Sequence, residues 1–197
     1  MKIFVIMGKS ASGKDTLYRE LIKDAELNLK PFLISTTRPM RDGEKEGVEY
    51  HFSNEEELKE LENKNKVIEK RVYHTVYGDW FYFTVDSENI DLKENDYLYI
   101  GTLESYEKMR DYYGEEKVVP LYIEVEDGER LKRALGREQE RENPGYAEMC
   151  RRFLSDAEDF SEEKIKHAKI EKRFDNGKEN TLEELKAEIK NNLKTLK

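Results

Sequence analysis

The residues most clearly suited to chemistry lie near the start of the chain. A five-residue apolar run, 3–7, leads into the segment GKSASGKDT, 8–16. The spacing G-x-x-x-x-G-K is that of a phosphate-binding P-loop, in which two glycines let the backbone curl around a phosphate and Lys14 reaches its oxygens. The candidate nucleotide-binding residues in this loop are Gly8, Ser10, Ala11, Ser12, Gly13, Lys14, Asp15 and Thr16.

One position departs from the P-loop pattern. The residue after the lysine is usually a serine or threonine that binds Mg²⁺, but here it is Asp15, with Thr16 one place later. A carboxylate is favoured at a helix N-terminus by the helix dipole. It can also hold the water shell of a metal ion. The loop therefore predicts a bound nucleoside triphosphate, with Asp15 as the candidate residue for holding the metal through water.

A length of 197 residues favours one compact α/β unit with inserted segments over two independent domains. Acidic residues number 44 and basic residues 35, and the net charge of −9 disfavours nucleic acid or an anionic membrane as a partner. The single cysteine, Cys150, excludes an intramolecular disulfide. There is neither a signal-peptide pattern nor an apolar run of roughly 18 residues. These features predict a cytoplasmic protein with small-molecule partners, either a monomer or a homodimer.

Apolar runs alternate with helical patterns along most of the chain, which predicts a parallel sheet flanked by helices. Strands are expected at 3–7, 31–35, 97–101, 118–125 and 169–174, and helices at 14–27, 103–113, 129–137, 145–160 and 181–196. Two segments break this alternation. The first, 36–85, starts with basic turn residues and continues with a short acidic helix at 54–64 and a run of β-branched and aromatic residues. The second, 126–160, is densely charged and rich in arginine.

The first of these segments carries a specific signature. Residues 36–44, TTRPMRDGE, followed by 47–52, GVEYHF, resemble the T-T-R-x-P-R-x-G-E-x-x-G-x-x-Y-x-F pattern of the guanylate kinase family. Further segments resemble the family over nearly the whole chain: 67–69 its F-x-E segment, 77–78 its Y-G, 131–137 its lid helix, 152–153 the next helix and Asn176 a C-terminal asparagine. The resemblance implies a P-loop core with a small β-rich flap that binds a nucleoside monophosphate and a helical lid. The expected division is core at 1–35, flap at 36–85, core at 86–125, lid at 126–160 and core at 161–197.

The same resemblance implies the activity and the roles of individual residues. The family transfers the γ-phosphoryl group of ATP to GMP in the presence of Mg²⁺. Arginines suit this reaction because forked guanidinium groups pair with phosphate oxygens and neutralise developing charge. The implied catalytic residues are Lys14, Arg38, Arg133, Arg137 and Arg152. The implied acceptor-binding residues are Ser35, Arg38, Arg41, Tyr50, Glu69, Tyr77 and Asp79, with Glu69 reading the guanine N1–H and 2-amino groups, and Asn176 joins the ATP-binding residues.

Three departures concern the base-binding side of this pattern. Ile34 and Asp79 stand where the family has hydroxyl residues that contribute to base recognition, and 97–102, YLYIGT, replaces the family's D-x-D. Two alternatives therefore stay open. A kinase of the same fold could phosphorylate another nucleotide or a sugar phosphate such as ribose bisphosphate. A non-catalytic guanylate-kinase-like module could bind protein partners, although such modules typically lack the lysine that is intact here as Lys14.

Overall fold

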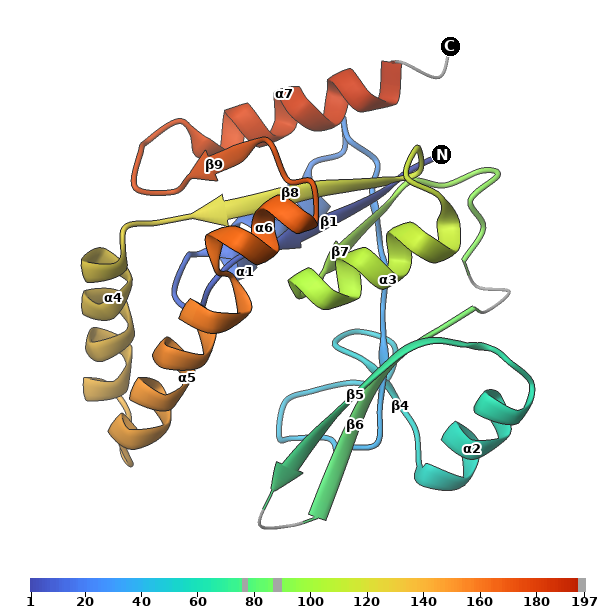
Figure 1. Cartoon of the computed structure of the whole chain (residues 1–197), viewed down its shortest axis with the longest axis horizontal. Coiled ribbons are helices and arrows are strands. Elements are labelled where there is room, and N and C mark those ends of the chain that lie inside the picture. Colours follow the sequence, from blue (N-terminus) through green and yellow to red (C-terminus); the bar gives the residue numbers. More distant parts are fainter. Residues whose placement is uncertain (76–77, 87–89, 195–197) are drawn as a thin grey trace.

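The computed structural model describes residues 1–75, 78–86 and 90–194. Within these residues, a five-stranded parallel sheet in the order β2-β7-β1-β8-β9 forms the centre of the molecule (Figure 1). Its strands are β1 (Ile3–Met7), β2 (Lys30–Pro31), β7 (Tyr97–Ile100), β8 (Val118–Glu124) and β9 (Arg173–Asp175). The α/β fold class expected from the sequence is thereby confirmed.

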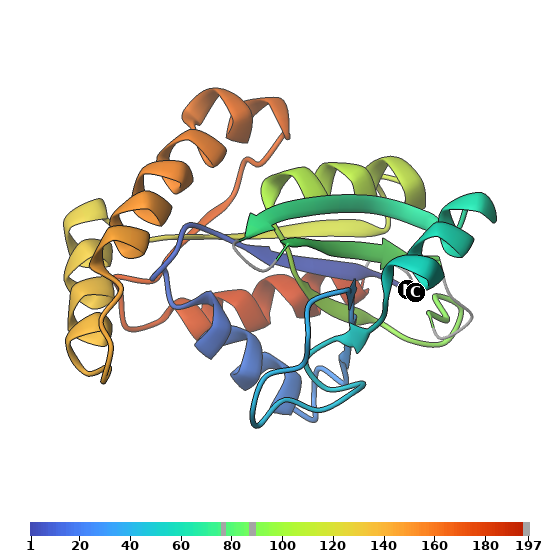
Figure 2. The same cartoon turned by 90° about the horizontal axis from the view of Figure 1, so that it is seen from below.

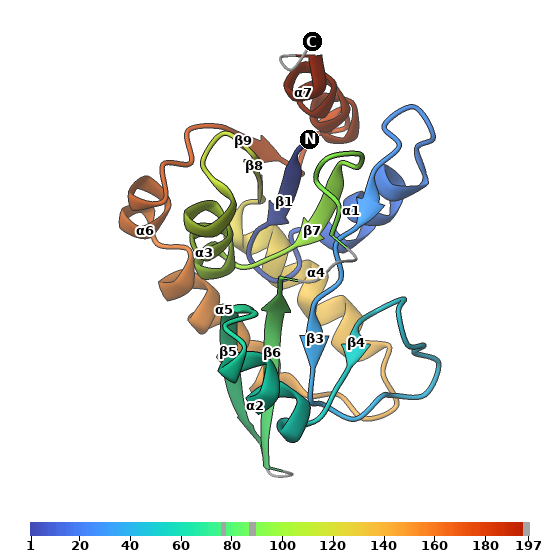
Figure 3. The ribbon, with the colours of Figure 1, turned by 90° about the vertical axis from the view of Figure 1, so that its right-hand side faces the viewer.

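Both faces of the sheet are buried at its central strands, which explains why β1 and β7 are continuous apolar runs. Successive side chains of β1 point to opposite faces, so Val5 packs with Met109 on one face and Ile6 packs with Leu21 and Leu185 on the other. Helices α3 and α6 cover the first face, and α1 and α7 cover the second (Figure 3). Their bounds are α1 Lys14–Lys23, α3 Leu103–Tyr113, α6 Glu162–His167 and α7 Thr181–Lys194.

The position of β1 fixes where the P-loop lies. β1 pairs in parallel with β7 on one side and with β8 on the other. The loop that follows β1 therefore lies at the edge of the sheet where parallel strands end, which is the edge at which open α/β sheets bind ligands.

Residues 35–75 and 78–85, called the flap below, have a sheet of their own. Its strands β3 (Ser35–Thr36), β4 (His51–Phe52), β5 (Val67–Thr75) and β6 (Gly78–Val85) follow the order β4-β3-β6-β5. The acidic helix expected before β5 is present as α2 (Glu55–Asn63), and Asn54 caps it by accepting a hydrogen bond from the backbone N–H of Glu57. The flap is therefore a compact β unit with one helix at its end.

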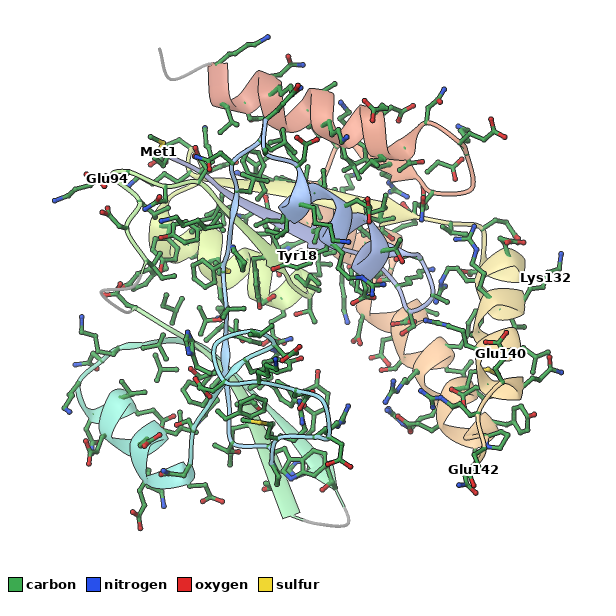
Figure 4. All side chains as sticks on the ribbon, turned by 180° about the vertical axis from the view of Figure 1, so that it is seen from behind. Met1, Tyr18, Glu94, Lys132, Glu140 and Glu142 are labelled. Atoms are coloured by element: carbon green, nitrogen blue, oxygen red, sulfur yellow. The ribbon has the colours of Figure 1, made fainter. Side chains whose placement is uncertain are left out.

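The arginine-rich segment folds into two helices, α4 (Asp127–Gln139) and α5 (Tyr146–Asp159), called the lid helices or the lid below. They pack partly through the buried Arg130, whose guanidinium lies 4.9 Å from the ring centroid of Phe153. Both helices stand at the end of the molecule opposite α2 (Figure 2). In Figure 4, Lys132 extends outward from α4 and Glu142 lies at the far end of this helix pair.

Two expectations about secondary structure are wrong. The run 31–35 is not one strand: β2 ends at Pro31 in the core sheet, and β3 begins at Ser35 in the flap sheet. This apolar segment is where the chain crosses from one sheet to the other, and its buried residues Phe32 and Ile34 pack in the core. The last strand, expected at 169–174, spans only Arg173–Asp175, because α6 and the turn after it occupy the chain as far as Lys169. No helix in the described part of the chain is both long and apolar enough to cross a membrane.

Candidate active site

The P-loop has the backbone shape that its glycines predict. Gly13 has φ +84°, and a Cβ there would lie 2.4 Å from Asn176 Nδ2, so only glycine fits without strain. A Cβ on Gly8 would lie 2.3 Å from the backbone oxygen of Ile123. The Ser12 hydroxyl is fully buried and has no hydrogen-bond partner among the described residues. An orphaned polar atom inside this loop fits a site built to receive a polar ligand.

Three side chains from distant segments hold the P-loop in place. Asp156 of α5 accepts a hydrogen bond from the backbone N–H of Ser10 at 2.8 Å. Arg130 of α4 donates from Nε to the Ser10 carbonyl at 2.9 Å and from Nη2 to Asp156 at 2.9 Å. Asn176, an expected ATP-binding residue, donates from Nδ2 to the carbonyl of Ser12 at 2.7 Å. The loop is therefore connected both to the lid and to the segment after β9.

The start of α1 could hold a metal bound to phosphate. The side chains of Asp15 and Thr16 are exposed there, and Asp15 Oδ2 lies 3.8 Å from Lys14 Nζ. In the described residues, no group of three His, Cys, Asp or Glu side chains is placed to bind a metal by itself. This donor set fits Mg²⁺ because that ion is commonly held by one or two protein ligands together with substrate phosphates and water.

The two flap arginines differ in their surroundings. Arg38 is buried and donates to both carboxylate oxygens of Glu44 at 2.8 and 2.9 Å, and from Nε to the Tyr82 hydroxyl at 3.1 Å. The hydrogen bond from Arg38 holds the pKa of Glu44 below its ordinary value, with a further contribution from the backbone N–H of Arg41. The side chain of Arg41 is exposed. Arg38 is thus already paired in this structure, whereas Arg41 is free to meet a ligand from solvent.

Tyr50, the expected partner of these arginines, lies beside Arg38. The Arg38 guanidinium is 5.4 Å from the centroid of the Tyr50 ring. Tyr50 also packs edge-on against Tyr82, with centroids 5.6 Å apart, and burial raises the pKa of its hydroxyl. The structure therefore brings Arg38, Arg41 and Tyr50 together on one side of the flap.

Glu69 lies on β5, opposite Thr84 of β6. Its side chain is only 3% exposed, and Oε1 accepts a hydrogen bond from the Thr84 hydroxyl at 2.8 Å. Arg71, two residues along the same strand, donates from Nε to Glu69 Oε2 at 3.1 Å. The Tyr99 hydroxyl, buried nearby, has no hydrogen-bond partner in the described part of the chain. The candidate base-reading carboxylate is therefore part of a buried polar cluster.

The remaining expected acceptor residues do not join this cluster. Ser35 is buried in β3 and pairs in register with Phe83. Asp79 lies near the exposed end of the β5–β6 hairpin, where its Oδ1 is 2.7 Å from His74 Nδ1. Ile34, which stands where the family has a hydroxyl residue, packs in the hydrophobic core. Tyr77 lies outside the described residues.

The lid arginines are spread along the helix pair. Of the three lid arginines expected to be catalytic, Arg133 lies beside the segment that contacts the P-loop: its Nη2 donates to the Asn176 carbonyl at 3.2 Å and its Nε donates to Glu129 at 3.1 Å. Arg137 is exposed on α4 and has no partner among the residues that the structure describes. Arg152 is exposed on α5 and pairs with Glu148 at 2.8 Å. The structure therefore places Arg133 next to Asn176, which itself contacts the P-loop, but leaves Arg137 and Arg152 on the lid surface.

A cleft of about 830 Å³ joins the core, flap and lid. Gly8, Ser10 and Lys14 of the P-loop line one part of it, and Arg71 and Tyr73 of β5 line another. The remaining lining residues surround the start of α3 (101–104 and Glu107) or belong to the α5–α6 region (Asp156, 159–161, Glu163, Lys164 and His167). The cleft is large enough for a small-molecule ligand. Lys14 of the P-loop and Arg71 of β5 therefore face one space.

Sequence reasoning missed Arg71, Arg130 and Asp156. Arg71 could have been found from strand periodicity, because residues two apart on a strand share a face with Glu69. Arg130 and Asp156 offered no local signal, since charged residues fill the whole segment. Their contact with Ser10, more than a hundred residues away, exists only in the folded chain.

A P-loop on a parallel sheet, facing a separate mixed sheet and a pair of lid helices, defines a P-loop α/β protein of the nucleotide-binding class. The family model for guanylate kinase matches residues 1–184. The chain therefore belongs to the guanylate kinase family.

Individual relatives agree with this assignment. The guanylate kinase of Malacoplasma penetrans is 30% identical over 182 residues, which cover 89% of this chain and 81% of that protein. The guanylate kinase of Porphyromonas gingivalis is 30% identical over 136 residues, covering 68% and 70% of the two chains. The crystal structure of guanylate kinase from Anaplasma phagocytophilum shares the fold, with a TM-score of 0.60 at 23% identity over 96% of this chain and 84% of that one.

Proposed function

We propose that this protein transfers the γ-phosphoryl group of ATP to GMP, giving ADP and GDP. The observation that carries the proposal is that Lys14 of the P-loop and Arg71 of the flap line the same cleft. Arg71 is paired with the buried Glu69, so a phosphate-binding loop and a polar cluster suited to a base face one another. Transfer between two phosphates needs both partners held in one space.

The proposed donor site uses the P-loop. Its backbone N–H groups and Lys14 would bind the ATP phosphates, and Asp15 would hold Mg²⁺ through water. Mg²⁺, when bound there, would neutralise negative charge on the β- and γ-phosphates. Arg133, which already contacts the segment at Asn176, would add positive charge beside the transferring group. Arg137 and Arg152 would reach that group only if the lid moves toward it.

The proposed acceptor site uses the flap. Arg41 and Tyr50 would hold the phosphate of GMP, together with Arg38 once its guanidinium exchanges Glu44 for phosphate oxygens. Under this proposal, 36–85 acts as an acceptor-binding flap and 126–160 as a lid. Both then close on the core to exclude water during transfer.

A coupled assay of ADP release tests the proposal directly. It would use ATP and Mg²⁺ with GMP, dGMP, AMP, UMP, CMP and ribose bisphosphate as separate acceptors. We expect GMP to give the highest kcat/KM. Turnover of ribose bisphosphate but not GMP would instead support a kinase of the same fold with a base-free acceptor. Failure with every acceptor would support the non-catalytic module.

A further inference from the structure

Arg71 stands between Glu69 and the cleft. The Arg71 side chain is 14% exposed and lines the cleft, whereas that of Glu69 is 3% exposed and lies behind it. Given GMP as the acceptor of the proposed function, we propose that Arg71 is the residue that reads the guanine base, through O6 and N7, and that Glu69 is a positioning residue that orients Arg71.

The contacts of Arg71 leave one edge of its guanidinium available. Nε donates to Glu69 Oε2 at 3.1 Å, and Nη2 is 3.4 Å from Oε1. Nη1 lies toward Thr102, 3.4 Å from its hydroxyl oxygen, and Thr102 also lines the cleft. A guanidinium held side-on by a carboxylate keeps further N–H donors on its Nη1–Nη2 edge, because the group has five donors in a rigid plane.

That edge matches guanine. Two parallel N–H donors from arginine pair well with guanine O6 and N7, which are adjacent acceptors. Adenine offers N7 as an acceptor but an amino group in place of O6, so one donor of the protein would face another donor. Arg71 can therefore distinguish guanine from adenine by direct contact, which the carboxylate of Glu69, buried behind it, could not do.

Ile34 and Asp79, which stand where the family has hydroxyl residues that recognise the base, do not take the place of Arg71 as a donor to guanine O6. Ile34 packs in the core, and Asp79 is held by His74 near the end of the hairpin. Neither supplies a donor for O6.

An acceptor with a second phosphate, such as ribose bisphosphate, is disfavoured at this position. Glu69 already neutralises the charge of Arg71, and further carboxylates, among them Glu104 and Glu107, line the cleft.

The experiment compares three acceptors that differ in their base edges. IMP keeps O6 and N7 but lacks the 2-amino group, and 7-deaza-GMP lacks N7. For the wild type, we expect kcat/KM for IMP within about threefold of that for GMP, and a loss of about tenfold with 7-deaza-GMP. Direct reading by Glu69 predicts the reverse pattern, since the 2-amino group would then be bound and N7 would not.

The variants are Arg71→Ala and Arg71→Lys, with Lys70→Ala as the matched control on the same strand. Lys70 is exposed and pairs with Glu62 on the flap. We expect both Arg71 variants to lose about 10- to 100-fold in kcat/KM for GMP, to lose most of the 7-deaza penalty and to keep the wild-type KM for ATP. Arg71→Lys retains the charge without the fork, so it carries the test if Arg71→Ala does not fold. Lys70→Ala should stay within about twofold of wild type.

Glu69→Gln tests the positioning role. We expect it to shrink the 7-deaza penalty as the Arg71 variants do, which a purely structural effect on folding would not change. The proposal is overturned if the penalty persists in the Arg71 variants, or if IMP is much poorer than GMP while those variants stay active. A wild type that ignores all purine monophosphates and phosphorylates ribose bisphosphate would show that the proposed function itself had failed, and this inference with it.

Discussion

The carboxylate of Asp156 in α5 accepts a hydrogen bond from the backbone N–H of Ser10 in the P-loop, over a distance of 2.8 Å. Arg130 of α4 donates to the same carboxylate and to the Ser10 carbonyl, so one P-loop residue is held by the lid through both its donor and its acceptor. The shape of the P-loop and the position of the lid are therefore coupled physically. A change in either one alters the hydrogen bonding of the other.

Replacing Asp156 by alanine should weaken this coupling. The change leaves Arg130 with Asp127 and Phe153 as neighbours but without its buried carboxylate. We expect the free energy of unfolding to fall by about 1–3 kcal/mol, because a buried charge loses a partner, and the KM for ATP to rise. Urea unfolding and steady-state kinetics measure the two effects. Glu158→Ala, which removes an exposed carboxylate on the same helix, is the control and should change the free energy of unfolding by less than about 0.5 kcal/mol. Equal effects from the two variants would contradict the coupling between the P-loop and the lid.

The substitution Lys14→Ala should abolish phosphotransfer and leave the fold intact. Lys14 lines the cleft, and within the described residues its one ion pair is the 3.8 Å approach of Asp15, so little folded structure depends on it. The lost charge would otherwise neutralise the β- and γ-phosphates in the transition state. We expect kcat to fall by about 100-fold or more, with an unchanged melting temperature. Lys23→Ala in the last turn of α1 is the control, and activity within tenfold of wild type for Lys14→Ala would reject the assignment of the P-loop.

The substitution Arg41→Ala should raise the KM for the monophosphate far more than the KM for ATP. Its exposed side chain is free to pair with the acceptor phosphate, while Arg38 is engaged by Glu44. We expect an increase of about tenfold or more in the acceptor KM, measured by varying GMP and ATP separately. Lys45→Ala, in the same loop, is the control. A larger rise in the KM for ATP would show that the flap serves the donor instead.

The pH dependence of stability should reflect the lid ion pairs at Glu148. Hydrogen bonds from Arg151 and Arg152 lower the pKa of Glu148 to about 2. Because this pKa is lower in the folded state than the ordinary value of 4.5, the stabilisation is complete above that value and is lost as the pH falls toward 2. The pairs are exposed, so we expect about 1 kcal/mol or less. Urea unfolding of wild type and Glu148→Gln should differ near neutral pH and converge toward about pH 2; a difference independent of pH would contradict this reading.

The core and the P-loop could be predicted from local sequence. A run of apolar residues that ends in glycines and a lysine at fixed spacing has few alternative structures, because the backbone at Gly13 tolerates no side chain. Alternating apolar runs and amphipathic helices likewise specified a parallel sheet with covered faces. The flap signature located Arg38, Arg41, Tyr50 and Glu69 on one inserted unit.

Which of these side chains face the cleft and which are already paired could be seen only in the folded chain. Whether Arg38 meets Glu44 or a ligand depends on how the loop at 39–50 folds back. Whether Arg71 or Glu69 lines the cleft depends on how the β5–β6 hairpin packs near α3. The contact between Asp156 and Ser10 joins residues 146 positions apart. Such contacts arise from the packing of distant elements, and neither local propensity nor periodicity contains that information.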